Sequence, residues 1–206
     1  INNFNMGAME NKSLNIFIDL GSSKIRLGVF NEETSNILFI LEKSCISNFS
    51  LKNFDIKSSN EIIKDLIKSA EKKIDKHIKN IDLMIDTPDM FSIDISIKKS
   101  SDSKKVMHND IQSLLKEAKN IIQNNYLDKK IIHMIVKKFV FDEDEYFKIP
   151  DNQINYKFLT VELKFFCFSN KIWESLQNLF KSNFIDIDNI YCSSYVRASN
   201  CNLVFD

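Results

Sequence analysis

The residues best suited to chemistry in this sequence lie in one short turn. Asp19 stands near the end of an apolar run, and Gly21, Ser22, Ser23 and Lys24 follow it. Glycine allows close backbone approach, and successive N–H groups in such a turn can point at phosphate oxygens. The serine hydroxyls add donors, and the Lys24 ammonium supplies a cation for a β- or γ-phosphate. Asp19 is placed to hold Mg²⁺ through water, since this ion needs few carboxylates. The turn predicts a phosphate-binding hairpin, and a plain tight turn between two strands is the alternative.

Apolar strands and one helix must position this turn. The run before it is β-branched and the run after it alternates, so the turn joins two strands of a hairpin. The helix is expected because apolar residues recur at helical spacing after a serine that can act as its cap. The expected elements are strands over residues 14–20, 24–31, 36–43 and 81–86 and a helix over residues 60–79, capped by Ser59.

The sequence changes character after this first section. Residues 90–98 alternate strictly between apolar and polar side chains, which predicts a half-buried antiparallel strand. Its free edge is a candidate for pairing with a partner chain. The remaining expected elements are a helix capped by Asn109, long strands over residues 130–141 and 156–168, a solvated acidic tip over residues 142–145, a helix capped by Ser169, a strand over residues 186–191 and a helix over residues 193–201. The order is β-β-β-α-β, then an inserted β-α-β-β unit, then α-β-α.

The composition excludes several classes of function. Twenty-eight basic residues offset 28 acidic ones, so the net charge of zero leaves no electrostatic footprint for nucleic acid or an anionic membrane. No apolar run approaches the ~20 residues that span a bilayer. The four cysteines form no C-x-x-C pair, which argues against a cysteine metal site and favours a reducing cytoplasm.

No catalytic residue is predicted. His133 lies in an apolar strand, where a packed structural histidine is the favoured interpretation. No serine or cysteine has an evident histidine and carboxylate partner, and the chain holds only three histidines. Enzyme activity is therefore left open, with a weak ATPase as the most that a complete protein would show.

The Asp19 hairpin resembles the first phosphate hairpin of the superfamily of actin, sugar kinases and heat-shock chaperones. Within it the chain looks like the N-terminal half of the bacterial cell-division family FtsA. Residues 130–142 are similar to the family's histidine-containing strand, with His133 at the histidine, and residues 156–184 match its next strand and helix. Residues 186–195 fit the strand and helix start that follow. The resemblance spans roughly residues 14 to 200 and lies more in order and spacing than in one motif.

This resemblance implies the fold and the domain organisation. The fold class is α/β (mixed α+β), a ribonuclease-H-like half of an actin fold with an inserted β-α-β-β subdomain. Residues 13–86 with 169–206 would form subdomain 1A, and residues 87–168 the inserted interaction subdomain 1C. Residues 1–12, which include Gly7-Ala8-Met9, are expected to be a tag or disordered leader.

The resemblance also implies the ligands and partners. A complete family protein binds ATP and Mg²⁺, and its contacts carry over here only to Asp19, Gly21, Ser22, Ser23 and Lys24. Residues 87–168 would contact division proteins and mediate self-association, whereas the tubulin-like protein FtsZ would bind only through the second half. The complete protein would act in the cytoplasm at the inner face of the cell membrane.

Two departures from the family keep alternatives open. The family's Pro-x-Gly turn is replaced by residues 149–153, which lack glycine, and the second phosphate loop and adenosine pocket are absent. The sequence is therefore expected to be a fragment that binds nucleotide weakly or not at all. A stand-alone protein-interaction module with a vestigial nucleotide site is one alternative. A pilus-assembly protein resembling PilM is another, and a sugar kinase is disfavoured because the insert is not the usual kinase arrangement.

Overall fold

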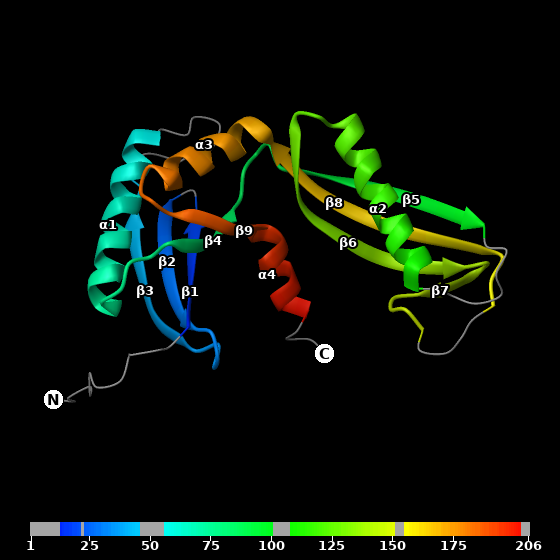
Figure 1. The fold of residues 1–206 in the computed structure, drawn as a ribbon, viewed down its shortest axis with the longest axis horizontal. Helices are drawn as coiled ribbons and strands as arrows, with labels where there is room; N and C mark the ends of the chain where they lie inside the picture. Colours follow the sequence, from blue (N-terminus) through cyan, green and yellow to red (C-terminus); the bar gives the residue numbers. More distant parts are fainter. Residues whose placement is uncertain (1–12, 22, 46–55, 101–107, 151–154, 203–206) are drawn as a thin grey trace. The chain divides into compact units, whose positions relative to one another are not determined.

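The computed structural model describes residues 13–21, 23–45, 56–100, 108–150 and 155–202 (Figure 1). The predicted leader over residues 1–12 lies outside this part of the chain. The chain divides into two compact units: Ile1–Pro88 with Ile172–Asp206 forms unit 1, and Asp89–Lys171 forms unit 2. Each unit has its own sheet and its own helices.

Unit 1 is built on a five-stranded sheet in the order β3-β2-β1-β4-β9. Its strands are β1 (Leu14–Leu20), β2 (Lys24–Asn31), β3 (Ile37–Ser44), β4 (Asn80–Ile85) and β9 (Asp186–Cys192). The first three pair antiparallel, whereas β4 runs parallel to both β1 and β9. The ends of β1 and β2 match the prediction residue for residue, because a buried apolar run and a strict alternation on either side of Gly21 leave little choice of boundary.

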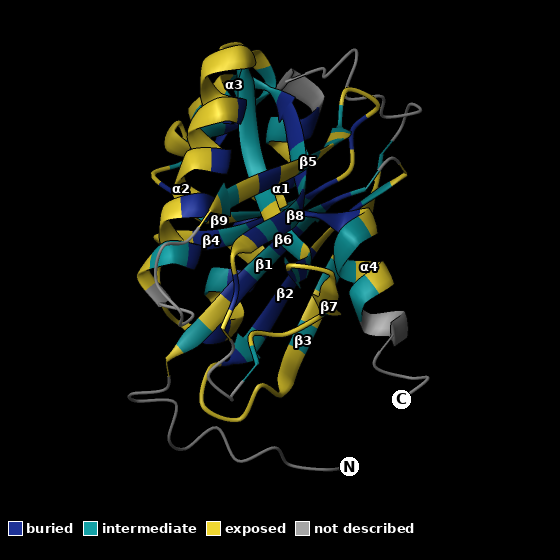
Figure 2. Ribbon diagram, turned by 90° about the vertical axis from the view of Figure 1, so that its right-hand side faces the viewer, coloured by how far each residue is buried: buried dark blue, intermediate teal, exposed yellow. Residues whose placement is uncertain are grey.

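The core of unit 1 lies between this sheet and helices α1 (Ile56–Ile74) and α3 (Asn170–Lys181). The central strands are largely buried (Figure 2). The buried side chains are Ile16, Ile18 and Leu20 of β1, Ile25, Leu27 and Val29 of β2, Ile63, Leu66, Ile67, Ala70 and Ile74 of α1, and Leu176, Leu179 and Phe180 of α3. Helix α4 (Ser193–Asn202) follows β9 directly, which confirms the predicted helix there.

Helix α1 differs from the prediction at both ends. It begins at Ile56, so Ser59 is an interior residue and the prediction that it caps the helix is wrong. It ends at Ile74 because Asp75 adopts a left-handed φ of 52°. The Glu71 carboxylate then accepts a hydrogen bond from the Ile78 amide at 2.9 Å, which fixes the chain in a non-helical connection.

Unit 2 is a four-stranded antiparallel sheet in the order β5-β8-β6-β7, with helix α2 (His108–Asn125) packed on one face. Its strands are β5 (Phe91–Ser100), β6 (Lys129–Phe141), β7 (Asp144–Tyr146) and β8 (Phe158–Ser169). Alternate residues of β8, including Leu159, Val161 and Phe165, form a core with Leu114 and Ala118 of α2. The alternating strand β5 lies at an edge of this sheet, as its sequence predicted.

Local predictions for unit 2 are partly confirmed. Asn109 is the second residue of α2 and does not cap it. Residues 142–145 are all exposed at the tip of a hairpin, as predicted, but the short strand β7 was not expected. This strand is held in place by the Tyr146 ring, which packs against Phe141 with centroids 5.6 Å apart. Asp142, with φ 57°, turns the chain, and its carboxylate accepts hydrogen bonds from the Lys157 and Phe158 amides. Ser169 fulfils its predicted capping role, because its hydroxyl accepts a hydrogen bond from the Lys171 amide at 3.3 Å.

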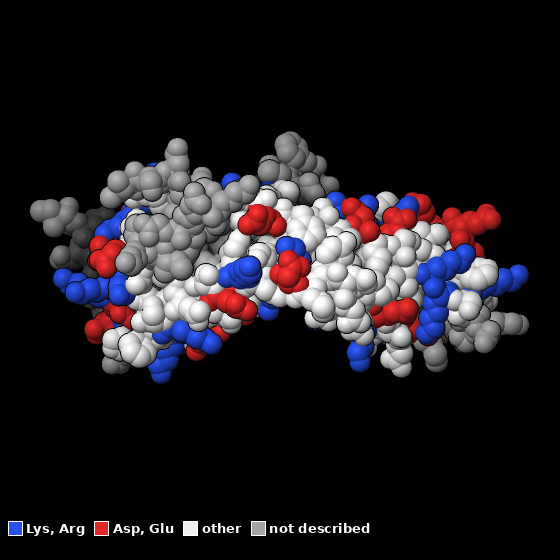
Figure 3. All heavy atoms as spheres, turned by 90° about the horizontal axis from the view of Figure 1, so that it is seen from above, with Lys and Arg blue, Asp and Glu red and all other residues white. Residues whose placement is uncertain are grey.

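The surface matches the balanced charge of the sequence. Acidic and basic side chains are interspersed on the face drawn in Figure 3. Among the helices of the described residues, none combines the length and the hydrophobicity that a membrane span requires.

Candidate functional site

The candidate site lies where three parallel strands of unit 1 end. Because β1, β4 and β9 run in the same direction, their carboxyl ends meet at one edge of the sheet, where open α/β sheets bind ligands. Asp19 stands at this end of β1, Asp86 follows β4, and Ser193 begins α4 after β9. The Ser193 hydroxyl donates to Asp19 Oδ1 at 3.3 Å, and the Ser194 hydroxyl donates to Asp86 Oδ2 at 2.7 Å. Residues far apart in the sequence therefore share one small polar cluster.

Asp19 is the predicted metal-binding residue and lies in a row of charges across the sheet. It pairs in register with Arg26 of β2, which pairs in turn with Glu42 of β3. Arg26 Nη1 lies 3.4 Å from Asp19 Oδ2, and the Asp19 side chain keeps 18% of its surface exposed. The carboxylate is thus reachable from solvent, but its charge is partly balanced by the guanidinium.

Lys24, predicted to meet a phosphate, is held by the neighbouring strand. Its Nζ lies 2.6 Å from Glu42 Oε1, and Arg26 Nε lies 3.4 Å from Glu42 Oε2. The pKa of the Glu42 carboxyl is lowered, first by the hydrogen bond from Lys24 and then by its positive charge. Lys24 would have to exchange this carboxylate for a phosphate. Because the pair is exposed to water, such an exchange costs little.

Gly21 is required by the shape of the turn. A Cβ atom at this position would lie 2.8 Å from the Lys24 carbonyl oxygen, closer than side chains tolerate. The Ser23 carbonyl accepts a hydrogen bond from the Cys45 amide at 2.9 Å, which ties the turn to the end of β3. Ser22, the remaining predicted residue, lies outside the described residues.

Five polar residues of this cluster were not singled out from the sequence: Arg26, Glu42, Asp86, Ser193 and Ser194. Arg26 and Glu42 join the site only through strand register, which the sequence does not display. The serines had a readable signal, because serine is favoured at the start of a helix and a helix N-terminus can bind anions such as phosphate.

The donor set of this site is compatible with Mg²⁺ held largely by water. Within the described residues, no three His, Cys, Asp or Glu side chains gather into a metal-ligand cluster. A magnesium ion bound through one or two carboxylates, several waters and a substrate phosphate needs no such cluster. Asp19 suits such water-mediated magnesium binding, and Asp86 follows the neighbouring strand β4 at the same edge of the sheet. The backbone at Gly21, which has no side chain to shield it, suits a phosphate.

His133 takes no part in this site. It belongs to unit 2, and its ring meets Phe166 edge-to-face with centroids 6.2 Å apart. Burial lowers the pKa of the imidazole. These contacts are those of a packed aromatic side chain.

Comparison with known proteins shows similarity in structure but not in sequence. No protein-family model matches the chain, and no curated protein matches it in sequence. The structure is similar to a chain of the PilM–PilN type IV pilus biogenesis complex, with a TM-score of 0.59 and 8% identity over 90% of this chain. The present chain spans 48% of the length of that protein, about half.

Other solved structures are similar at lower scores. The cytoplasmic domain of EpsL, an inner-membrane component of the type II secretion system of Vibrio cholerae, has a TM-score of 0.42 and 9% identity, over 87% of this chain and 57% of that one. A Bacteroides thetaiotaomicron protein described as having an actin-like ATPase fold and unknown function has a TM-score of 0.35 and 13% identity, over 89% and 53%. The mixed α+β class predicted from the sequence is confirmed, and the chain shares its fold with the chain of the PilM–PilN complex.

Proposed function

We propose that this chain is one half of an actin-like nucleotide-binding protein that helps assemble a bacterial machine at the cytoplasmic face of the inner membrane. Unit 1 supplies half of an ATP and Mg²⁺ site, and unit 2 supplies protein contacts. The observation that carries the proposal is the meeting of the Asp19 hairpin with the start of α4 at the carboxyl ends of β1, β4 and β9.

The proposal gives the site residues the roles predicted from the sequence. Gly21, Ser22 and Ser23 offer backbone and hydroxyl donors to phosphate oxygens, and Lys24 offers charge after leaving Glu42. Asp19 holds Mg²⁺ through water. No residue is assigned a catalytic role, because a second lobe must close the site before any hydrolysis.

Unit 2 corresponds in this proposal to the inserted interaction subdomain. Its edge strand β5 and the sheet face opposite α2 are the candidate surfaces for partners. Unit 1 then corresponds to subdomain 1A, with residues 13–86 and 169–206, and the insert to residues 87–168.

A pilus-assembly protein resembling PilM and a division protein resembling FtsA are the two candidates for the machine. The PilM–PilN complex shares the fold over nine-tenths of this chain, which favours the first. The Asp19 hairpin and the His133 strand carry the resemblance to the second. Affinity purification of the tagged protein from its own cells distinguishes them, since pilus components are expected with the first and division components with the second.

Nuclear magnetic resonance tests the nucleotide site even when binding is weak. Addition of millimolar Mg-ATP should shift the amide signals of Gly21, Ser23 and Ser193, and adenosine without phosphates should not. Lys24→Gln should reduce the shifts. Lys43→Gln, which breaks an equally exposed pair with Asp65, is the matched control. Shifts confined to other residues would contradict the site, and no shift at all would favour the stand-alone interaction module.

A further inference from the structure

A second hollow in unit 1 lies at the opposite end of the sheet from the candidate nucleotide site. It has a volume of about 870 Å³, in the range of ligand pockets. The Asp186 amide donates to the Lys79 carbonyl at 2.8 Å, which joins the amino ends of β4 and β9 at its edge. The residues that line it are Lys64, Ile67, Lys68 and Glu71 of α1, His77, Ile78, Lys79 and Asn80 before and at β4, and Ser182, Asn183, Phe184 and Asp186 after α3. The hollow is therefore independent of any nucleotide bound near Asp19.

The hollow is lined in part by an exposed aromatic residue, Phe184. Its side chain is 92% exposed, the largest exposed fraction among the large apolar side chains of the described residues. Its backbone is left-handed, with φ 62°. The Ile185 amide donates to the Phe180 carbonyl and the Phe184 amide to the Lys181 carbonyl, which is the Schellman arrangement that ends a helix.

Phenylalanine is a poor choice for that position on grounds of folding. The left-handed residue that ends a helix in this motif is usually glycine, because a Cβ atom strains the backbone there. Packing of the aromatic ring does not offset this strain, because almost all of the ring is exposed to water. A strained backbone that displays an aromatic ring beside a hollow is typical of a binding surface, because exposed aromatics serve as anchors for partners.

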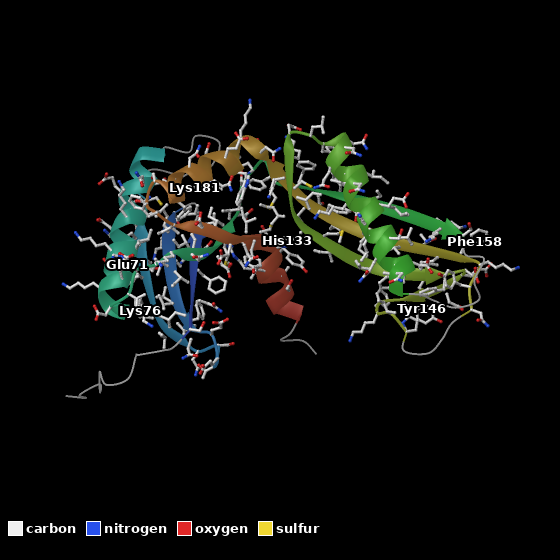
Figure 4. The ribbon with its side chains drawn as sticks, viewed as in Figure 1. Glu71, Lys76, His133, Tyr146, Phe158 and Lys181 are labelled. Carbon is white, nitrogen blue, oxygen red and sulfur yellow. The ribbon has the colours of Figure 1, made fainter. Side chains whose placement is uncertain are left out.

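The charges around the hollow indicate the sign of the partner. Among the described residues, Lys64 and Lys79 lie in no ion pair. Lys68 lies near Asp65, and its charge adds to the larger effect of Lys43 in lowering the pKa of that carboxyl. Glu71, one of the two carboxylates in the lining, is occupied by the Ile78 amide and lies 3.2 Å from His77 Nδ1. Figure 4 labels Glu71 on α1, Lys76 just after the end of α1 and Lys181 at the end of α3. The hollow thus offers the ammonium groups of three lysines against one further carboxylate, that of Asp186, over a floor that includes the buried Ile67 and Ile78.

We propose that this hollow binds an acidic peptide segment of a protein partner, with an apolar side chain of the peptide packed against Phe184. Carboxylates of the peptide would meet Lys64, Lys68 and Lys79. A small anion alone would satisfy the lysines but leave the Phe184 ring in water, so a peptide accounts for both features. Charge complementarity selects a negatively charged partner and speeds its association. The aromatic contact contributes most of the affinity.

Fluorescence anisotropy with a labelled peptide of glutamates interrupted by leucines tests this on the full 206-residue chain. Phe184→Gly is the decisive variant, because it removes the anchor while placing the residue that the backbone prefers. It should raise the melting temperature and weaken peptide binding about tenfold. A residue with only a structural role would not lose binding while the fold gains stability.

Charge reversal supplies the second measurement. Lys64→Glu with Lys68→Glu should weaken binding at least about tenfold, whereas Lys116→Glu on the exposed surface of α2 should leave it unchanged. A peptide with lysines in place of glutamates should not bind. The proposal is overturned if the wild-type chain ignores the acidic peptide, or if Phe184→Gly binds it as well as wild type. It is also overturned if inorganic phosphate competes fully for the hollow, or if sedimentation shows self-association that Phe184→Gly abolishes.

Discussion

Gly21 is the residue on which the candidate hairpin depends most directly. Replacing it with alanine puts a methyl group 2.8 Å from the Lys24 carbonyl, a backbone atom that cannot move without opening the turn. We expect Gly21→Ala to reduce the free energy of unfolding by about 1–3 kcal/mol, measured by urea denaturation. Gly28→Ala is the matched control, because its methyl would meet only the Phe30 ring, which can turn aside. An equal loss in both variants would contradict the special role of the turn.

We expect stability to depend on pH because His133 is partly buried. Burial lowers the pKa of its imidazole in the folded chain below the ordinary value of 6.5. As the pH falls through about 6.5, the unfolded chain binds a proton that the folded chain still refuses, so stability decreases. The loss stops once the pH is below the folded pKa. His133→Gln should flatten the denaturation midpoint against pH in that window, and an unchanged profile would show that burial at this position is unimportant.

Among the elements, α1 offers a test of where a helix begins. The Ser59 side chain is 1% exposed, and its hydroxyl has no hydrogen-bond partner among the described residues. Ser59→Ala should therefore leave stability unchanged or raise it by up to about 1 kcal/mol, because alanine favours the helix interior and buries no polar group. Ser169→Ala should lower stability by about 1 kcal/mol, because its hydroxyl caps α3. A loss of similar size in Ser59→Ala would restore its predicted capping role.

The sequence alone predicts some helices and strands correctly and misses others. Hydrophobic periodicity was enough for β1, β2 and the long strands of unit 2, since each buries alternate or continuous apolar residues. It failed at the end of α1, where Glu71 binds the amide of Ile78 seven residues later. It also missed β7, whose pairing depends on Tyr146 packing against Phe141. These contacts are side-chain interactions across turns, and a local pattern does not contain them.

The candidate site shows the same limit over longer distances. The hairpin from Asp19 to Lys24 was visible because its residues are consecutive. Arg26 reaches Asp19 through strand register, and Ser193 reaches it across 174 positions of sequence. The rest of the site could not be predicted, because strand pairing and not local sequence decides which carboxyl ends meet at one edge of the sheet.

At the scale of the whole molecule, the two units should unfold separately because each has its own core. Phe165 is fully buried among residues of unit 2, and Leu27 is fully buried in unit 1. Phe165→Ala should cost roughly 3–5 kcal/mol and Leu27→Ala roughly 2–5 kcal/mol. Hydrogen exchange measured by mass spectrometry should then show faster exchange in β5, β6 and β8 for the first variant and in β1, β2 and β4 for the second. If either variant speeds exchange equally in all six strands, the units fold as one cooperative body.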